Sequence, residues 1–139
     1  MMISTRGRYA LRVMLELAEH PSDDYIPLKD IARKQDISEK YLESILPALI
    51  KQNFLLAHRG KGGGYRLARA PETYTVGSII KLVENSLAPV TCLEGETNEC
   101  SRAQDCRTLP MWRKLNQMID DYLEGITLAE LCHGMPEHT

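Results

Sequence analysis

The 139-residue sequence contains no run of apolar residues that approaches the roughly 20 needed to cross a lipid bilayer. Its first nine residues are polar and basic, and they lack the apolar block of a secretory signal peptide. We therefore expect a cytoplasmic protein without a membrane partner. Internal repeats and low-complexity tracts are also missing, which excludes a repeat architecture.

Motifs that would indicate an enzyme are scarce. The chain has neither a Cys-x-x-Cys pair nor the β-α-β pattern of a thiol oxidoreductase, and the one cysteine beside a histidine is Cys132, next to His133. The glycine-rich stretch 60–64 lacks the Gly-Lys-Ser/Thr ending of a nucleotide-binding P-loop and lies between predicted strands. We therefore expect no enzymatic activity.

Charge is distributed unevenly along the chain, although the net charge is only −2. Residues 1–70 contain 12 Lys and Arg against 8 Asp and Glu, whereas residues 71–139 contain 5 against 11. A basic half beside an acidic half suggests that only the N-terminal half contacts a polyanion. The alternative is that this imbalance is ordinary scatter.

The spacing of apolar residues predicts three helices in the basic half. Ser4 or Thr5 is placed to cap the first, Pro27 suits the first position of the second, and Ser38 is placed to cap the third. Pro47 lies inside the third helix and cannot donate a backbone hydrogen bond, so we expect a local kink or a broken turn there. Residues 54–68 then change to short strands around a glycine-rich tip, which predicts a β-hairpin.

The acidic half begins with a fourth predicted helix, which Thr75 is placed to cap. Residues 88–108 look irregular, and a long helix is predicted over 110–123. Its apolar residues have a 4-3-4 spacing, which favours packing between the helices of two subunits; the alternative is packing in the chain's own core. Thr127–Glu130 has the pattern of a capping box that opens a short last helix. The apolar stripe of the long helix consists of Met111, Leu115, Met118 and Tyr122.

The order helix, helix, turn, helix, two strands predicts a winged helix-turn-helix. The predicted fold class is therefore mostly α with a small β-hairpin. Residues 1–75 form the DNA-binding domain, and residues 76–139 supply a linker helix, a cysteine loop at 88–108, a dimerisation helix and a short C-terminal helix. In such a domain the third helix enters the major groove of double-stranded DNA with its N-terminal residues facing the bases.

The third helix begins with side chains that suit this role. Lysine can donate to guanine, glutamate can accept from cytosine, and serine and tyrosine can bind phosphate oxygens. The alternative is that these side chains are the solvated face of an amphipathic helix. The candidate DNA-binding residues here are Ser38, Glu39, Lys40, Tyr41, Glu43 and Ser44.

The tip of the hairpin carries two basic residues among glycines. Because glycines add no side-chain bulk, they let backbone amides and an arginine approach phosphates or enter a minor groove. The alternative is a flexible turn that happens to be basic. The candidate DNA-binding residues of this tip are Arg59, Gly60, Lys61 and Gly62.

Five segments, in the correct order over nearly the whole chain, resemble the IscR/NsrR/CymR family of bacterial repressors. This resemblance implies a homodimer, joined through the long C-terminal helix, that binds a palindromic operator through the third helix and a minor-groove wing. It implies that Glu43 reads bases, that Arg59 is the wing arginine, and that Ser4, Thr5, Arg8 and Tyr9 also belong to the DNA-binding surface. Lys40 stands where members often have a small polar residue, so the operator sequence does not carry over. The segments are Ile3–Ala10, Tyr41–Glu43, Arg59–Tyr65, Trp112–Arg113 and Ile126–Leu131.

Three cysteines, Cys92, Cys100 and Cys106, fall within fifteen residues of the irregular stretch. Thiolates are soft ligands that suit an iron–sulfur cluster or zinc. Seven and five residues separate them, which is wide for zinc and suits a loop around a larger cluster. The alternatives are zinc and redox-active thiols without a metal.

The resemblance also implies an iron–sulfur cluster, because IscR-like and NsrR-like members hold one with three cysteines here. The first cysteine spacing is longer than the usual five. The fourth ligand is open, since Leu109 replaces the histidine of the IscR branch and Arg8 replaces the aspartate of the NsrR branch. The candidates are Asp105, a carboxylate of the partner subunit, or Cys132 and His133.

The sequence therefore predicts a transcription regulator whose DNA binding depends on a cluster or on the redox state of its cysteines. One alternative is a cluster-free regulator of the same fold, controlled by redox thiols or by a partner protein as in the CymR branch. Another is a winged-helix module that binds a protein in place of DNA.

Overall fold

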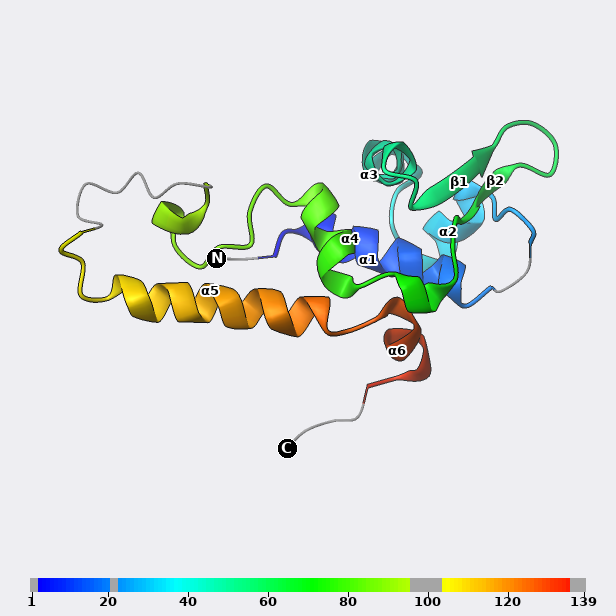
Figure 1. The fold of residues 1–139 in the computed structure, drawn as a ribbon. Helices are drawn as coiled ribbons and strands as arrows, with labels where there is room; N and C mark the ends of the chain where they lie inside the picture. Colours follow the sequence, from blue (N-terminus) through cyan, green and yellow to red (C-terminus); the bar gives the residue numbers. More distant parts are fainter. Residues whose placement is uncertain (1–2, 21–22, 96–103, 136–139) are drawn as a thin grey trace.

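The structure, a computed structural model, describes residues 3–20, 23–95 and 104–135. A helical body carries the hairpin at one end, and the longest helix runs along the side of the molecule opposite the third helix and the hairpin (Figure 1). The predicted fold class, mostly α with a small hairpin, is confirmed. The elements in chain order are α1 Thr5–Ala18, α2 Leu28–Gln35, α3 Glu39–Lys51, β1 Leu55–His58, β2 Gly64–Leu67, the 3-10 turn η1 Pro71–Thr73, α4 Val76–Val83, the 3-10 turn η2 Thr91–Leu93, α5 Leu109–Glu124 and α6 Leu128–His133.

The helices begin where hydroxyl side chains can cap them. Ser4, Ser38 and Thr75 cap α1, α3 and α4, and each hydroxyl accepts from the backbone N–H three residues on, over 3.2, 3.1 and 3.0 Å. Thr127 and Glu130 form the predicted reciprocal capping box at the start of α6. These contacts satisfy backbone donors that have no partner within the helix.

The two prolines of the helix-turn-helix differ slightly from expectation. Pro27 is the N-cap of α2, one residue before the predicted position. The broken turn expected at Pro47 is wrong, because α3 continues through it to Lys51. Leu46 and Leu49, on either side of the proline, are almost completely buried, so core packing holds the helix together despite one missing backbone hydrogen bond.

One core joins the two halves of the sequence. Helix α1 packs against α2, α3, α4 and α6. Three residues of the second half are fully buried in the same cluster as the helix-turn-helix core: Tyr74, Ile79 and Leu128. The position of α4 and α6 is thus fixed relative to α3, while the division of function at residue 75 stays a prediction.

Tyr74 fastens the hairpin to this core. Its side chain is fully buried, and its hydroxyl donates to the carbonyl of Phe54 over 2.8 Å. The same oxygen accepts from the backbone N–H groups of Ala68 and Arg69 over 3.1 and 3.0 Å. One side chain therefore joins the segments that enter and leave the antiparallel β1–β2 pair.

Within the described ranges, no helix is both long enough and apolar enough to cross a bilayer.

Candidate nucleic-acid interface and cysteine loop

Helix α3 has a buried apolar face and an exposed polar face. Leu42, Ile45 and Leu49 are fully buried against the core. On the other face five of the six predicted DNA-binding residues are exposed, and Tyr41 is half-buried. The apolar face of α3 is therefore packed against the core, and its polar N-terminal half is exposed to solvent. The exposed residues are Ser38, Glu39, Lys40, Glu43 and Ser44.

The first turns of α1 hold α3 in place. Tyr9 and Tyr41 meet edge to face, with ring centroids 5.4 Å apart. The guanidinium of Arg6 donates to the backbone carbonyl of Ser44 over 2.9 Å. Tyr9 and Tyr41 thus have a packing role here. The role of Arg6 was missed by the sequence analysis, since no local pattern pairs it with a residue 38 positions away.

The predicted residues at the start of α1 fall into two groups. Thr5 and Arg8 are exposed, and Arg8 donates to the Thr5 hydroxyl over 3.2 Å. Ser4 is half-buried, and it binds Glu84 through both its backbone N–H and its hydroxyl. Thr5 and Arg8 are consequently accessible to a DNA phosphate, whereas the backbone N–H and the hydroxyl of Ser4 already bind Glu84.

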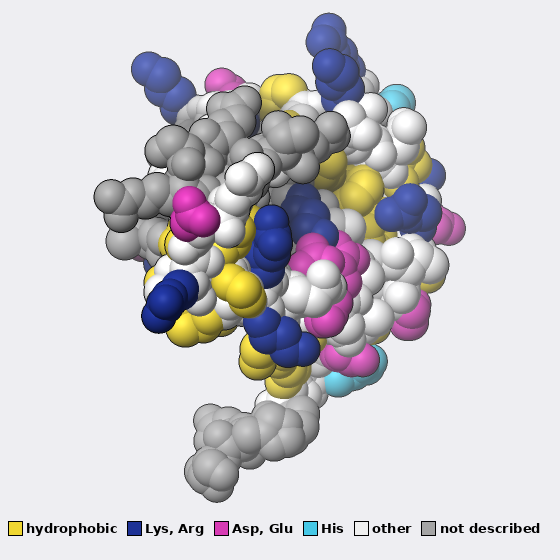
Figure 2. All heavy atoms as spheres, turned by 60° about the vertical axis from the view of Figure 1, so that its left-hand side comes forward, with side chains coloured by type: hydrophobic (Ala, Val, Ile, Leu, Met, Phe, Trp, Pro, Cys, Tyr) yellow, Lys and Arg dark blue, Asp and Glu magenta, His cyan; other side chains and the backbone are white. Residues whose placement is uncertain are grey.

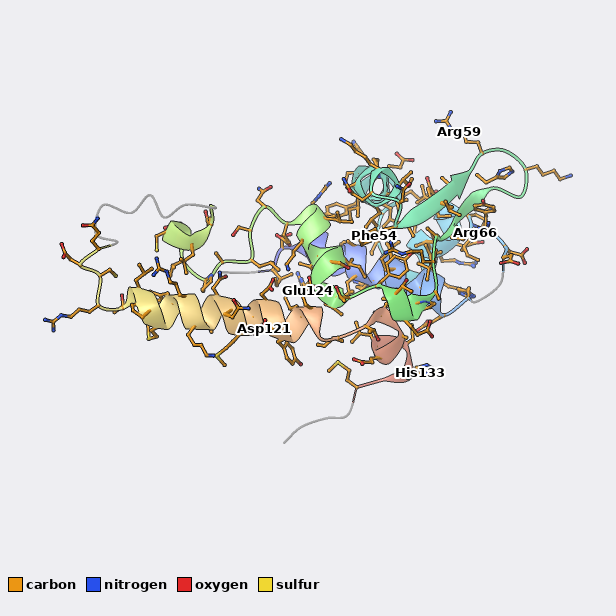
Figure 3. The ribbon with its side chains drawn as sticks, in the orientation of Figure 1. Phe54, Arg59, Arg66, Asp121, Glu124 and His133 are labelled. Atoms are coloured by element: carbon orange, nitrogen blue, oxygen red, sulfur yellow. The ribbon has the colours of Figure 1, made fainter. Side chains whose placement is uncertain are left out.

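The hairpin tip requires glycine. Gly60 and Gly62 have φ values of +93° and +74°, which side-chain-bearing residues rarely adopt. A Cβ on Gly63 would lie 2.3 Å from the carbonyl oxygen of His58. Arg59 and Lys61 are exposed, and Arg59 points away from the body of the molecule (Figure 3).

The base of the hairpin is fixed although its tip projects. Ile26 and Tyr65 exchange two backbone hydrogen bonds of 2.9 Å, which adds a short bridge to the edge of β2. Arg66 donates to the carbonyl of Asp23 over 2.7 Å and lies 4.8 Å from the ring centre of Tyr25. The hairpin and α3 lie on the same side of the molecule, so both can face one DNA duplex (Figure 1).

Two of the three predicted cluster ligands are described. Cys92 lies in η2 and Cys106 in the turn before α5, and both are half-buried. Both segments lie at the end of the molecule where α5 begins (Figure 1). The Cys106 sulfur is 3.3 Å from the hydroxyl of Thr108. Cys100 lies outside the described residues, and within those residues no three metal-ligating side chains come together.

The candidates for a fourth ligand are placed differently. Asp105 is exposed beside Cys106. Cys132 and His133 lie on α6, at the opposite end of α5 within one chain (Figures 1 and 3). Burial, and then the nearby carboxylates of Glu19 and Glu72, raise the pKa of the Cys132 thiol, which disfavours the thiolate that binds metals.

Helix α5 exposes the four apolar side chains of its predicted stripe. Met111, Leu115, Met118 and Tyr122 are 54%, 38%, 55% and 62% exposed. Hydrophobic side chains appear between basic ones on the face that Figure 2 brings forward. Packing in the chain's own core, the alternative considered for this stripe, is therefore wrong.

Comparison with known proteins identifies the family. The model of the Rrf2 family, described as iron-dependent transcriptional regulators, matches residues 3–134. The chain belongs to the Rrf2 family. It is 39% identical over 134 residues to the HTH-type transcriptional regulator IscR of Erwinia tasmaniensis, covering 96% of this chain and 80% of that protein. The IscR of Aliivibrio salmonicida is 38% identical over 131 residues, with 94% and 77% covered.

Solved structures agree with this assignment. CymR, the global cysteine regulator of B. subtilis, superposes with a TM-score of 0.79 at 30% identity over 98% of this chain and 99% of that one. IscR of T. potens superposes with a TM-score of 0.74 at 32% identity, covering 99% and 94%. These relatives confirm the winged-helix architecture, a role in transcription regulation and DNA binding, and the expectation that this Rrf2 protein is not an enzyme.

Proposed function

We propose that this Rrf2 protein is a homodimeric, sequence-specific repressor of the bacterial cytoplasm, controlled by an iron–sulfur cluster or by the redox state of its cysteines. The observation that carries the proposal is the polar, exposed N-terminal half of α3 on the same side of the molecule as a basic hairpin tip (Figure 1). The apolar face of α3 packs against the core, and the base of the hairpin is bonded to Ile26 and Asp23. A double-stranded, palindromic operator is the matching ligand, since two-fold protein symmetry is mirrored in the DNA site.

The proposed contacts with DNA differ in what each side chain binds: a base edge, the minor groove or a phosphate. Glu43 faces outward on α3 and can accept a hydrogen bond from cytosine N4, so it supplies base choice. Arg59 at the hairpin tip supplies affinity in the minor groove. Thr5, Arg8 and Lys61 are exposed and can bind phosphates.

The dimer interface is proposed on α5. A stripe of four large apolar side chains exposed along one helix is costly to leave in water, and its spacing suits a second copy of the same helix. Pairing through α5 would leave α3 and the hairpin free, because they lie on the opposite side of the molecule (Figure 1).

An iron–sulfur cluster is the proposed cofactor of the cysteine loop. Cys92 and Cys106 are soft, partly accessible donors at the same end of the molecule, which fits such a group, and Cys100 is the third proposed ligand. When bound, the cluster supplies redox chemistry and sensitivity to oxygen or nitric oxide. The family description, iron-dependent transcriptional regulator, supports iron over zinc. Within one chain, Asp105 beside Cys106 is a better placed candidate for the fourth ligand than Cys132 and His133; a carboxylate of the partner subunit is the alternative.

A second proposal is a regulator of the same fold without a cluster. Its support is the similarity to two CymR proteins. The CymR of B. subtilis is described as a global cysteine regulator, and the CymR of Staphylococcus aureus, 30% identical to this chain, has been solved in an oxidised form. In this case the thiols themselves, or a partner protein, would control DNA binding.

The visible absorption spectrum of protein purified without oxygen separates these proposals. Charge-transfer bands of a brown sample support the cluster, and a colourless sample supports the bare thiols. Affinity for DNA is then compared between anaerobic protein, air-exposed protein and a Cys92→Ala, Cys100→Ala, Cys106→Ala triple variant. A change of roughly 5–150-fold is expected for coupled sites. Equal affinity in all three samples would remove the sensing role and leave DNA binding standing.

A further inference from the structure

Glu84 joins the end of α4 to the beginning of α1. Its carboxylate oxygen Oε1 accepts from the backbone N–H of Ser4 over 2.8 Å and from the Ser4 hydroxyl over 2.5 Å. Ser4 is the N-cap of α1, and Glu84 is the residue after the last turn of α4. Two hydrogen bonds to one charged acceptor fix the first turn of α1 relative to α4.

The surroundings favour this placement of the carboxylate. The first turn of α1 contains no acidic residue of its own, so Glu84 supplies the negative charge that a helix N-terminus favours. Gly7, which is buried, leaves room for the side chain. A Cβ at that position would lie 2.3 Å from the Glu84 oxygen.

The same first turns of α1 hold the recognition helix. Arg6 donates to the Ser44 carbonyl over 2.9 Å, and the Tyr9 ring packs against Tyr41. Because Arg6 and Tyr9 lie on the first two turns of α1, a shift of this end of the helix relative to α4 would move both contacts. Ser44 and Tyr41 belong to the part of α3 that is proposed to face DNA.

Glu84 is also the residue at which the chain leaves α4 towards Cys92, eight residues on. We propose that Glu84 is a positioning residue that couples this segment to DNA recognition through Ser4 and α1. A rearrangement of the cysteine loop that withdraws Glu84 from Ser4 would loosen Arg6 and Tyr9 from α3. This route lies within one chain and does not pass through the dimer helix. It rests on the proposed DNA-binding function.

The test compares affinity for a duplex that the wild-type protein selects from a random-sequence pool with affinity for a scrambled duplex. Glu84→Ala should lower the ratio of the selected-duplex affinity to the scrambled-duplex affinity roughly tenfold, which is the scale of losing hydrogen bonds to a charged group. Glu84→Gln keeps an acceptor for Ser4 and should retain most of the ratio. Glu94→Ala, which removes an exposed carboxylate from the same segment, is the matched control and should leave the ratio unchanged.

Gly7→Ala tests the contact from the other side. Alanine favours helix formation, so the variant should keep its melting temperature, while its Cβ displaces the Glu84 carboxylate and lowers the ratio. Because Glu84 is proposed to act through Arg6, Glu84→Ala combined with Arg6→Met should be little worse than the more damaging single change.

Two results would overturn the inference: an unchanged ratio in Glu84→Ala and Gly7→Ala, or full additivity of Glu84→Ala and Arg6→Met. Failure of the wild-type protein to select any duplex would instead count against the proposed function, so the two failures are distinguishable.

Discussion

Lys81 on α4 donates a hydrogen bond to Oε1 of Glu124 on α5 over 2.9 Å. Asp120, one turn earlier on α5, binds the same ammonium group, and the hydroxyl of Thr75 donates to the other oxygen of Glu124 over 2.8 Å. Gly77 permits this approach, because a Cβ there would lie 2.5 Å from Glu124 Oε1. The helix proposed to form the dimer is thereby fastened to the body that carries α3.

Replacing Lys81 with methionine should weaken this connection in a pH-dependent way. Hydrogen bonding to Asp120 is the main cause that raises the pKa of Lys81, and hydrogen bonding to Lys81 is the main cause that lowers the pKa of Glu124. Both side chains are more than a third exposed, so solvent screening limits the effect to about 0.5 kcal/mol in the free energy of unfolding.

The stabilisation from this ion pair is lost at both ends of the pH range, through a different group at each end. Glu124 stabilises the folded state above the ordinary pKa of its carboxyl, and this stabilisation is lost as the pH falls through its lowered pKa. The stabilisation from Lys81 is lost as the pH rises through its raised pKa. Urea unfolding should therefore separate wild type from Lys81→Met at neutral pH and bring them together in acid and in strong alkali. A difference that is constant with pH would contradict this account. Lys114→Met, on the exposed surface of α5, is the control.

Tyr74→Phe should destabilise the hairpin. The change removes one hydroxyl that donates to Phe54 and accepts from the N–H groups of Ala68 and Arg69, leaving polar groups without their partner near the core. We expect a loss of about 1–3 kcal/mol in the free energy of unfolding, measured with urea. Tyr25→Phe, which keeps its ring against Arg66, is the control, and an equal effect of both changes would argue against the role of Tyr74.

These contacts show what a single sequence can and cannot predict. Caps such as Ser38 and the Thr127–Glu130 box were predicted because cap and partner lie within one turn. The Ser4–Glu84 and Lys81–Glu124 contacts were missed because their partners are 80 and 43 residues apart, and no periodicity relates them.

For other features, the sequence predicted only part of what the structure shows. The spacing on α5 predicted an apolar stripe, and its exposure agrees with an interface outside the chain. At Pro47 the expected broken turn does not occur, because buried leucines on both sides of the proline keep the helix continuous. In the cysteine loop, Cys100 lies outside the described residues, so the set of ligands for the proposed cluster stays a prediction.

Leu115→Glu should convert the proposed dimer into monomers or make the protein insoluble. The substitution places a carboxylate in the middle of the exposed stripe of α5, where a second copy would have to bury it. Sedimentation velocity measures the outcome. Leu115→Met keeps the site apolar and should remain dimeric, whereas a Leu115→Glu protein with an unchanged dimer mass would rule out this interface.

Arg59→Ala should weaken DNA binding and reduce its salt dependence. A cation at the hairpin tip releases about one counterion, so the slope of log affinity against log salt should fall by roughly one. Glu43→Gln is the contrast, since it should keep the slope and change which bases are accepted. Arg113→Ala removes an exposed charge from α5 and is the control. Wild-type binding by Arg59→Ala at every salt concentration would mean that the hairpin does not touch DNA.

Selection of duplexes by the wild-type protein from a random-sequence pool, followed by sequencing, tests the central claim most directly. A dimer that presents two α3 helices to DNA should enrich an inverted repeat, with half-site centres one helical turn, about 10 base pairs, or a multiple of it apart. Enrichment of no motif, or of a single half-site without a symmetric partner, would contradict the account.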